Sequence, residues 1–554
     1  MIKNVFKINF KKYLALYALL LGIIFTKNTK AQEYIMPVLD INGVSVKEIK
    51  MNYDYGDEGV VIDSEKNYSL EAEAGKNYEI TVSFTGTSEN TTYVNIGYDY
   101  VTEDQIVPNI NASANDRSGL INESVKKGVV EKRIFNVAAI DNKINLHFSG
   151  EGQLLNINLK EIKADDTEHK TTIYTIGDSL VQTYSEKYLP QTGWGQTLGR
   201  YFNENVICEN YAIGGRSTGN FLRQGRLNEV LTKIRPGDYV FIEFGHNDAS
   251  SGNEDRYVSV DDYKKNLSDI YIKAVEQRGG IAVLVTLANR NDYNKSTGVF
   301  NVSFPQYVSA MKEVANETGT KIIDLNAMTV EYFTKLNKEL GVGVTDNLIY
   351  NHAMAGMFTG EYVGGVEDNT HLGQYGAMLV GGMVARGAYE LKLPGLLENY
   401  VDAGKADKVP ETPENITKKK YSGFISRIKW DASDGADYYK VSVADVADGK
   451  VSGDFKVIGY TPVCDFSYDK AALKHDYAYK ITAINSAGES KESEVFIFTY
   501  DSADKKNNKD DYKNNLYVRK EEKSKNNLPI FAGGIIAAVV VFLGLLFVFK
   551  RKKK

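Results

Sequence analysis

The stretch "TIYTIGDSL", residues 172–180, decides how the middle of the chain folds. Its apolar first half is long enough for a strand, and it stops abruptly at Gly177-Asp178-Ser179, where a loop leading into a helix is expected. Four similar apolar runs follow along the chain: "NVICENYAI", "DYVFIEFG", "GIAVLVTLA" and "KIIDLNA". Such runs, without polar residues at every second position, are typical of strands buried on both faces of a parallel sheet.

Amphipathic helical patterns separate these runs. Two examples are "TGNFLRQGRLNEVLTKI" (218–234) and "VDDYKKNLSDIYIKAVEQRG" (260–279), and "GQYGAMLVGGMVARGAYEL" (373–391) closes the series. Strands that alternate with helices predict an α/β domain over residues 170–401, with a parallel sheet covered by helices on both faces. In such open sheets ligands bind beyond the carboxyl ends of the strands, which is where Ser179 is expected.

A serine hydroxyl at that edge is a weak nucleophile unless a histidine takes its proton and a carboxylate orients the histidine. The chain has six histidines. His371 in "EDNTHLG" fits this role, because Asp368 precedes it by three residues and one turn of loop would present both side chains to the same place. The sequence therefore predicts a catalytic set in the chain order Ser179, Asp368, His371.

Attack on an ester also requires hydrogen-bond donors aimed at the oxygen on which negative charge develops. "YAIGGRS" follows the second predicted strand, and Gly215 in it has no side chain to block its N–H. "EFGHND" follows the third strand, where Asn247 offers a side-chain amide. With the backbone N–H of Ser179, these groups are the predicted oxyanion hole.

Five other polar residues near strand ends have less specific signals. Asp178 is expected to cap the N-terminus of the following helix. His246 is expected to lie near the substrate rather than to act as the base. Arg216 and Arg290 would either bind a carboxylate of the substrate or be ordinary surface arginines. His352 has no polar partner nearby in the sequence and is interpreted as structural.

The blocks "GDSL", "GGRS", "GHND" and the Asp368-x-x-His371 pair together resemble those of the SGNH, or GDSL-type, hydrolases over about residues 171–400. The resemblance implies a flavodoxin-like sheet and hydrolysis of acyl esters with no metal or other cofactor. Within that family, "FGHND" and "GGRS" look most like rhamnogalacturonan acetylesterases, which remove acetyl groups from pectin backbones.

Strand patterns flank the α/β domain on both sides. In residues 32–165 apolar and polar residues alternate, as in "YEITVSF", which predicts an antiparallel β-sandwich. Its tyrosines would either stack on sugars, which would make this a carbohydrate-binding domain, or be ordinary core and surface residues; they include Tyr53, Tyr55, Tyr98 and Tyr100.

Residues 408–502 resemble a fibronectin type III domain, with strand patterns such as "YYKVSVADV" and "YAYKITAINSAGES". The resemblance implies that Trp430 lies in the core and that Tyr477 is the corner tyrosine. The two cysteines, Cys208 and Cys464, fall in different predicted domains, so no disulfide between them is expected.

The ends of the chain have targeting signals. Residues 1–31 contain a basic region, then an apolar run, then a cleavage site with a small residue, which is the pattern of a signal peptide. An N-terminal membrane anchor is the alternative. Residues 503–527 are polar and predict a flexible linker. Residues 528–549 include an uncharged run long enough to cross a bilayer, and the basic residues 550–554 would stay in the cytoplasm. We therefore expect an exported, membrane-anchored protein with its catalytic domain outside.

The net charge of the chain limits which class of partner it can bind. Residues 1–31 carry six lysines and no acid and the tail carries five basic residues, so the net charge of −6 becomes −17 once both are removed. This acidity argues against nucleic acid as a partner. The expected function is removal of acetyl groups from a polysaccharide, foremost pectic rhamnogalacturonan. The alternatives are an esterase for xylan, a cell-wall glycan or a lipid, and a non-catalytic surface protein for adhesion or glycan binding.

Overall fold

The computed structural model describes residues 52–54, 60–62, 66–99, 120–162, 167–419, 426–472 and 475–500. The described residues up to 162 form one compact unit, and those from 167 onward form a second. The predicted signal peptide, linker, membrane span and basic tail lie outside these ranges. Among the helices of the described ranges, none combines the length and the apolar character needed to span a bilayer.

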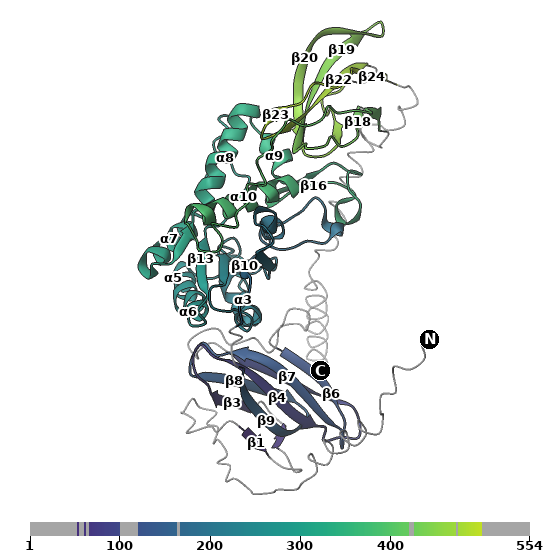
Figure 1. Cartoon of the computed structure of the whole chain (residues 1–554). Helices are drawn as coiled ribbons and strands as arrows, with labels where there is room; N and C mark the ends of the chain where they lie inside the picture. The colour runs from purple at the N-terminus through teal and green to yellow at the C-terminus, as the bar shows by residue number, and fades with distance from the viewer. Residues whose placement is uncertain are drawn as a thin grey trace, which may run out of the picture. The chain divides into compact units, whose positions relative to one another are not determined.

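The first unit contains two antiparallel sheets, ordered β1-β9-β4-β7 with β2 paired to β9, and β3-β8-β5-β6 (Figure 1). The alternation noted along "YEITVSF" buries Ile80, Val82 and Phe84 of β4 completely. The strands are β1 (Asn52–Asp54), β2 (Val60–Ile62), β3 (Lys66–Glu71), β4 (Asn77–Thr85), β5 (Thr92–Asp99), β6 (Leu120–Val125), β7 (Val130–Ala138), β8 (Lys143–Gly150) and β9 (Gly152–Ile162). Side chains of the four tyrosines considered for sugar stacking lie outside the described set.

The second unit begins with a parallel sheet of five strands in the order β11-β10-β12-β13-β14. Counted along the chain this is the flavodoxin-like order, so the predicted parallel α/β sheet is confirmed. The strands are β10 (Thr171–Gly177), β11 (Val206–Asn210), β12 (Tyr239–Glu243), β13 (Ile281–Val285) and β14 (Lys321–Ile323). Only the first half of "KIIDLNA" is a strand, because Asp324 caps the next helix by accepting a hydrogen bond from Ala327 N.

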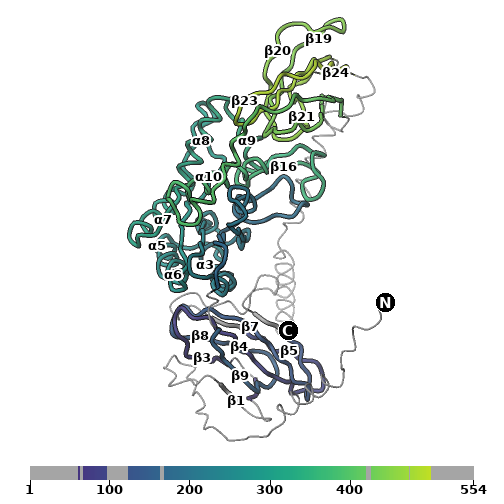
Figure 2. The backbone as a smooth tube through the Cα atoms, viewed as in Figure 1, coloured from purple at the N-terminus to yellow at the C-terminus, as the bar shows by residue number. Residues whose placement is uncertain are grey.

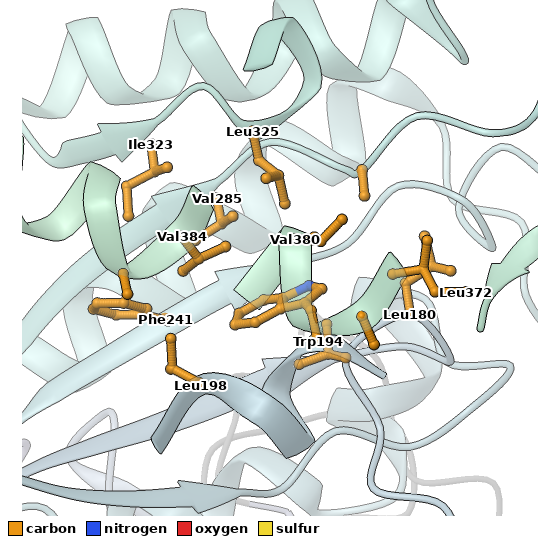
Figure 3. Packing of buried hydrophobic residues seen from close by; sticks show 14 of the residues in the cluster. Leu180, Trp194, Leu198, Phe241, Val285, Ile323, Leu325, Leu372, Val380 and Val384 are labelled. Carbon is orange, nitrogen blue, oxygen red and sulfur yellow. The ribbon is translucent and has the colours of Figure 1, made fainter. Parts of the chain in front are cut away.

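Helices cover both faces of this sheet. One face is covered by α2 (Trp194–Thr197), α8 (Leu325–Leu340) and α10 (Gln374–Glu390). Figure 3 shows the packing there, where Trp194 and Leu198 lie among Phe241, Val285, Val380 and Val384. Trp194 is fully buried, so this face supplies much of the hydrophobic stabilisation of the second unit.

The opposite face is covered by α3 (Thr218–Arg223), α4 (Arg226–Leu231), α5 (Val260–Lys265), α6 (Lys273–Glu276) and α7 (Pro305–Thr318). Aromatic rings join these helices to the sheet, with Phe221 and Phe244 centred 5.3 Å apart. The helix predicted over residues 218–234 is broken at Gly225, whose left-handed φ of 67° ends α3 and starts α4. Between α5 and α6 the turns widen to a π-helix over Asn266–Ile272.

The chain ends its described course in two further antiparallel sheets, which Figure 2 shows following α10. Their strands are β17 (Thr417–Lys418), β18 (Arg427–Lys429), β19 (Tyr438–Ala447), β20 (Lys450–Thr461), β21 (Asp465–Ser467), β22 (Tyr477–Asn485), β23 (Gly488–Glu489) and β24 (Phe496–Phe498). Trp430 is buried in their core, and Tyr477 Oη accepts a hydrogen bond of 2.8 Å from Ala472 N. Both features fit a fibronectin type III-like domain, which remains our proposal for this C-terminal sandwich.

The C-terminal sandwich packs directly on the α/β domain. Arg427 is buried and forms two hydrogen bonds with Asp465, of 2.6 and 2.9 Å. It also donates to Ala355 O at 2.7 Å, and Lys419 Nζ donates to Gly356 O at 3.2 Å. The rings of Tyr375 on α10 and Tyr438 on β19 add an apolar contact, with centroids 5.4 Å apart.

Candidate active site

Ser179 lies just beyond the end of β10, at the point where the order of the sheet strands reverses. Gly177 pairs with Glu243 of β12, and a Cβ on Gly177 would come within 2.5 Å of Glu243 O, so this position requires glycine. Asp178 accepts a hydrogen bond of 3.0 Å from Leu180 N and closes a turn. The predicted helix cap at Asp178 is therefore wrong, because the residues after it form a turn, and the next α-helix starts only at Trp194.

Three predicted residues meet at this point. Ser179 Oγ lies 3.0 Å from His371 Nε2, and His371 Nδ1 lies 2.7 Å from Asp368 Oδ2. Each of the three side chains is partly exposed, so a bound ester would be able to reach them. An imidazole that donates from Nδ1 to a carboxylate leaves Nε2 free to accept the proton of the serine hydroxyl.

Asp368 and His371 are placed by an irregular hairpin of β15 (Tyr350–Ala353) and β16 (Val366–Leu372). Tyr350 pairs with Leu372 and His352 pairs with Glu367, so β16 contains three more residues than β15 between the same two pairs. We expected a loop here, but the pair lies on a strand that bulges. The bulge is what allows Asp368 and His371 to face the same way, since residues three apart on a regular strand face opposite ways.

Hydrogen bonds within the bulge set the charge of Asp368. Its Oδ1 accepts from Thr370 N at 2.7 Å and from His371 N at 3.1 Å. Burial raises the pKa of Asp368, but the hydrogen bond and charge of His371 and these two N–H groups outweigh burial, so its pKa lies below the usual value. Asp368 is thus a stable anion facing the imidazole.

Two backbone N–H groups near Ser179 are available to donate hydrogen bonds. Within the described residues, Ser179 N and Gly215 N have no hydrogen-bond acceptor. A Cβ on Gly214 would lie 3.4 Å from Ser179 Cβ, which places the Gly214–Gly215 turn against Ser179. Gly215 has a left-handed φ of 79°, a conformation that glycine adopts without strain.

The amide of Asn247 is held by Asp178, the residue before Ser179. Asn247 Nδ2 donates to Asp178 Oδ2 at 3.2 Å and to Arg216 O at 3.1 Å. Both amide hydrogens are therefore in use, and one must turn to the substrate oxygen when an oxyanion forms. The fully buried Asp178 carboxylate has a positioning role here that the sequence analysis missed, because it considered only a helix cap.

The two arginines considered as ligands for a substrate carboxylate both donate hydrogen bonds to loops of the site. Arg216 donates to Gly214 O at 2.8 Å and to Gln224 Oε1 at 2.9 Å. Arg290 donates to Asn369 Oδ1 in the β16 bulge at 2.9 Å. Arg216 thus stabilises the Gly214–Gly215 turn, and Arg290 stabilises the segment between Asp368 and His371.

His246 precedes Asn247 in the chain and is buried. Its ring is buried, its Nδ1 is 3.6 Å from Asp178 Oδ2, and its ring nitrogens make no hydrogen bond with any described group. The ring packs edge-to-face on Phe304, with centroids 5.7 Å apart, and the Arg290 guanidinium lies 5.8 Å from the centre of the same Phe304 ring. His246 therefore packs between Asp178 and the ring of Phe304.

Two buried carboxyl groups near Asp178 escaped the sequence analysis. Burial, and then the charge of Asp178, raises the pKa of Glu243, although Trp194 Nε1 and Ala288 N donate hydrogen bonds to it. Burial likewise raises the pKa of Asp248 to about 7, against two hydrogen bonds from Thr218. The available signal was an acidic residue inside the apolar run "DYVFIEFG" and another directly after "GHN".

A cavity of about 550 Å³ lies between the α/β domain and the C-terminal sandwich rather than at Ser179 itself. Its lining includes Tyr184, whose hydroxyl donates to Ser179 O at 2.9 Å. The lining also includes His352, and burial lowers the pKa of this histidine. His352, which we interpreted from the sequence as structural, thus forms part of a cavity wall. In the described ranges, no group of three or more His, Cys, Asp or Glu side chains is arranged to hold a metal ion.

Residues 175–345 match the model of the GDSL-like Lipase/Acylhydrolase family. The chain is 37% identical over 223 residues to a protein of Bacillus subtilis (strain 168) named "Probable rhamnogalacturonan acetylesterase YesY", which covers 40% of this chain and 94% of the relative. It is 34% identical to the rhamnogalacturonan acetylesterase RhgT of the same organism, covering 40% of this chain and 91% of RhgT. The crystal structure of B. subtilis protein YxiM has 23% identity and a TM-score of 0.35, covering 60% of this chain and 82% of YxiM.

Proposed function

The chain belongs to the GDSL-like lipase/acylhydrolase family and is an ester hydrolase, and from this premise we propose that it removes acetyl groups from a polysaccharide, foremost pectic rhamnogalacturonan. The observation that carries the proposal is the unbroken series of hydrogen bonds from Ser179 Oγ through the imidazole of His371 to the carboxylate of Asp368. The names of the two B. subtilis relatives support the choice of an acetylated pectin as substrate.

In the proposed mechanism, Ser179 Oγ attacks the carbonyl carbon of the acetyl ester while His371 Nε2 takes the hydroxyl proton. Asp368 stabilises the imidazolium that forms. The N–H groups of Ser179 and Gly215 and one N–H of Asn247 donate to the oxyanion. The intermediate collapses, His371 returns the proton to the departing sugar oxygen, and an acetyl ester remains on Ser179.

Water completes the cycle. His371 Nε2 removes a proton from a water molecule, whose oxygen attacks the acetyl carbonyl carbon. The bond to Ser179 Oγ then breaks, Ser179 regains its proton from the imidazolium, and acetic acid leaves as acetate plus a proton. Every proton transfer uses the one nitrogen that faces Ser179 in the structure.

The test is acetate release from acetylated pectin, acetylated xylan, an acetylated cell-wall glycan and a lipid ester, with p-nitrophenyl acetate as a small neutral substrate. The proposal expects release from the pectin to be fastest and the Ser179→Ala variant to be inactive on all substrates, with unchanged thermal unfolding. If acetate release were fastest from the xylan or from the cell-wall glycan, that polymer would be the substrate instead of pectin. Absence of turnover on every substrate, including p-nitrophenyl acetate, would favour a surface adhesion protein.

We also propose that the protein acts outside the cell and is held there by residues 528–549. The support is the uncharged run with basic residues 550–554 after it, and the basic and apolar segment at residues 1–31. Fractionation of cells that express the full chain and a chain truncated after Tyr500 tests this. The full chain should be in the membrane fraction and sensitive to external protease, and the truncated chain should be active in the medium; retention of the truncated chain on cells would contradict this mode of anchoring.

A further inference from the structure

Arg256 has a guanidinium group that lies across the two loops expected to form the oxyanion hole. Arg256 Nη1 is 3.4 Å from Asn247 Oδ1. A Cβ on Gly215 would lie 3.1 Å from Arg256 Nη2, so the same guanidinium also faces Gly215. Arg256 carries no signal in the sequence, because it stands in a polar loop nine residues after Asn247 rather than at a strand end.

Among the described residues, the guanidinium of Arg256 has one hydrogen-bonding contact, with Asn247. Apart from the long contact with Asn247, it makes no hydrogen bond or ion pair with any group in the described ranges. The neighbouring Asp255 instead contacts Arg223, whose Nη2 donates to Asp255 O at 2.5 Å. By contrast, Arg216 Nη1 donates to Gly214 O and Arg290 Nη2 donates to Asn369 Oδ1, both in loops of the site.

The loop that carries Arg256 is fixed although the side chain is exposed. Arg256 N donates to Asn253 O at 3.0 Å, and Val258 N donates to Asp248 O at 3.1 Å. The buried hydroxyl of Tyr307 donates to Val258 O at 2.7 Å, which ties the end of the loop to α7. A fixed backbone with an exposed cationic side chain is the arrangement that a preformed anion-binding group requires.

The charges around Ser179 explain why an acidic substrate would need such a group. Asp178 is buried one residue before Ser179, and Asp368 is an anion that contacts His371, the neighbour of Ser179 Oγ. Like charges repel, and they do so more strongly where the surroundings are less polar than water. A polymer that carries a carboxylate would therefore be disfavoured at this site unless a cation faced it.

We propose that Arg256 binds the carboxylate of a uronic acid residue in the polysaccharide and so selects uronate-containing polymers over neutral ones. The inference rests on the proposed function, and it names the feature of the polymer that the site recognises. A guanidinium fits a carboxylate because its parallel N–H groups donate two hydrogen bonds at once. The polysaccharide that meets this requirement is an acetylated pectin, whereas an unsubstituted acetylated xylo-oligosaccharide does not.

The test compares Arg256→Gln with the native protein on three substrates: an acetylated rhamnogalacturonan oligosaccharide, a neutral acetylated xylo-oligosaccharide and p-nitrophenyl acetate. For the rhamnogalacturonan oligosaccharide, kcat/KM should fall about tenfold, mainly through a higher KM, since one charged hydrogen-bonding group at a partly solvated site is lost. The two neutral substrates should change less than about twofold, since they lack the carboxylate. Arg256→Lys should recover part of the loss, because it restores the charge without the paired N–H groups.

Arg386→Gln is the matched control, because it removes one exposed arginine charge from the last turns of α10. It should behave like the native protein on all three substrates. Added salt should lower kcat/KM of the native protein for the rhamnogalacturonan oligosaccharide, because it screens the attraction between charges. It should lower kcat/KM of Arg256→Gln much less.

Three outcomes would overturn the inference. An equal loss of kcat on all three substrates would show that Arg256 acts on the oxyanion or supports the loops. An unchanged KM for the rhamnogalacturonan oligosaccharide would show that no carboxylate binds there. Native protein that hydrolyses p-nitrophenyl acetate but neither oligosaccharide would overturn the proposed function, and the inference with it.

Discussion

His371 Nε2 lies 3.0 Å from Ser179 Oγ although the two residues are 192 positions apart in the chain. The serine follows the first strand of the parallel sheet, while the histidine comes from the bulged strand of a separate two-stranded sheet. The contact therefore depends on how the β15–β16 hairpin packs against the end of the large sheet. Changes to that hairpin should affect catalysis even where they leave the large sheet intact.

Asp368→Asn should lower kcat by on the order of 10³–10⁴. An amide cannot stabilise the imidazolium and can hold the ring in the tautomer whose Nε2 carries the proton. The measurement is steady-state kinetics with p-nitrophenyl acetate. Glu367→Gln is the control, since it removes the neighbouring carboxylate on the same strand without touching His371. Equal effects of the two substitutions would contradict the orienting role of Asp368.

Asn247→Ala should lower kcat by roughly 10²–10³ with a smaller change in KM, because an oxyanion donor acts mainly in the transition state. The Asp178 carboxylate would lose a hydrogen-bond donor in a buried place, so thermal unfolding should be followed in parallel. A higher KM at unchanged kcat would place Asn247 in ground-state binding of the substrate.

Asp248→Asn should make the free energy of unfolding less sensitive to rising pH. The folded-state pKa of Asp248 is raised to about 7, above the usual 3.8, so the folded protein keeps this proton while the unfolded chain loses it. The free energy of unfolding should therefore fall as the pH rises from about 4 to about 7, with the full penalty present above pH 7.

The asparagine has no proton to lose, so its stability relative to the native protein should rise over this pH range by on the order of 1–4 kcal/mol. Urea unfolding at acidic and neutral pH measures the difference. Asp261→Asn, an exposed carboxylate on α5, is the control for loss of an acidic residue. Parallel curves for native protein and Asp248→Asn would show that Asp248 is ionised in the folded state.

Arg427→Met should lower the free energy of unfolding of the second unit by about 3 kcal/mol, because it leaves part of the Asp465 carboxylate buried without a partner. The double substitution Arg427→Met with Asp465→Leu should cost less than the sum of the two single ones, since the partly exposed side chain of Lys419 can turn to solvent. Chemical denaturation of all four proteins measures the coupling. Strictly additive losses would show that the pair contributes nothing as a pair.

The sequence predicts the parallel sheet well because its strands are long apolar runs that end at glycines and polar loops. It predicts the neighbours of Ser179 because each block stands at a strand end, and parallel strands bring such ends to one edge. It misplaces the limits of shorter elements. The helix over residues 218–234 is broken because the left-handed backbone at Gly225 ends one helix before the next begins.

Other features could not be read from the sequence because they depend on distant contacts. The β16 bulge exists only through pairing with β15, which has no alternating pattern that marks it as a partner. The fold alone decides which guanidinium is engaged: Arg216 donates to Gly214 O at 2.8 Å, whereas among the described residues Arg256 makes only a contact of 3.4 Å with Asn247 Oδ1. The raised pKa of Asp248 depends on burial beneath α7, which composition does not reveal.

The carbonyl groups of Ala355 and Gly356 accept hydrogen bonds from side chains of the C-terminal sandwich, and this has a consequence for recombination between genes. Both carbonyls stand on the connection from β15 to β16, the strand that bears His371. A crossover that exchanged the sandwich for an unrelated module would leave them without their donors and would loosen that connection. The two parts should therefore be inherited together, and a module swapped in from elsewhere would have to supply its own cations at these two points.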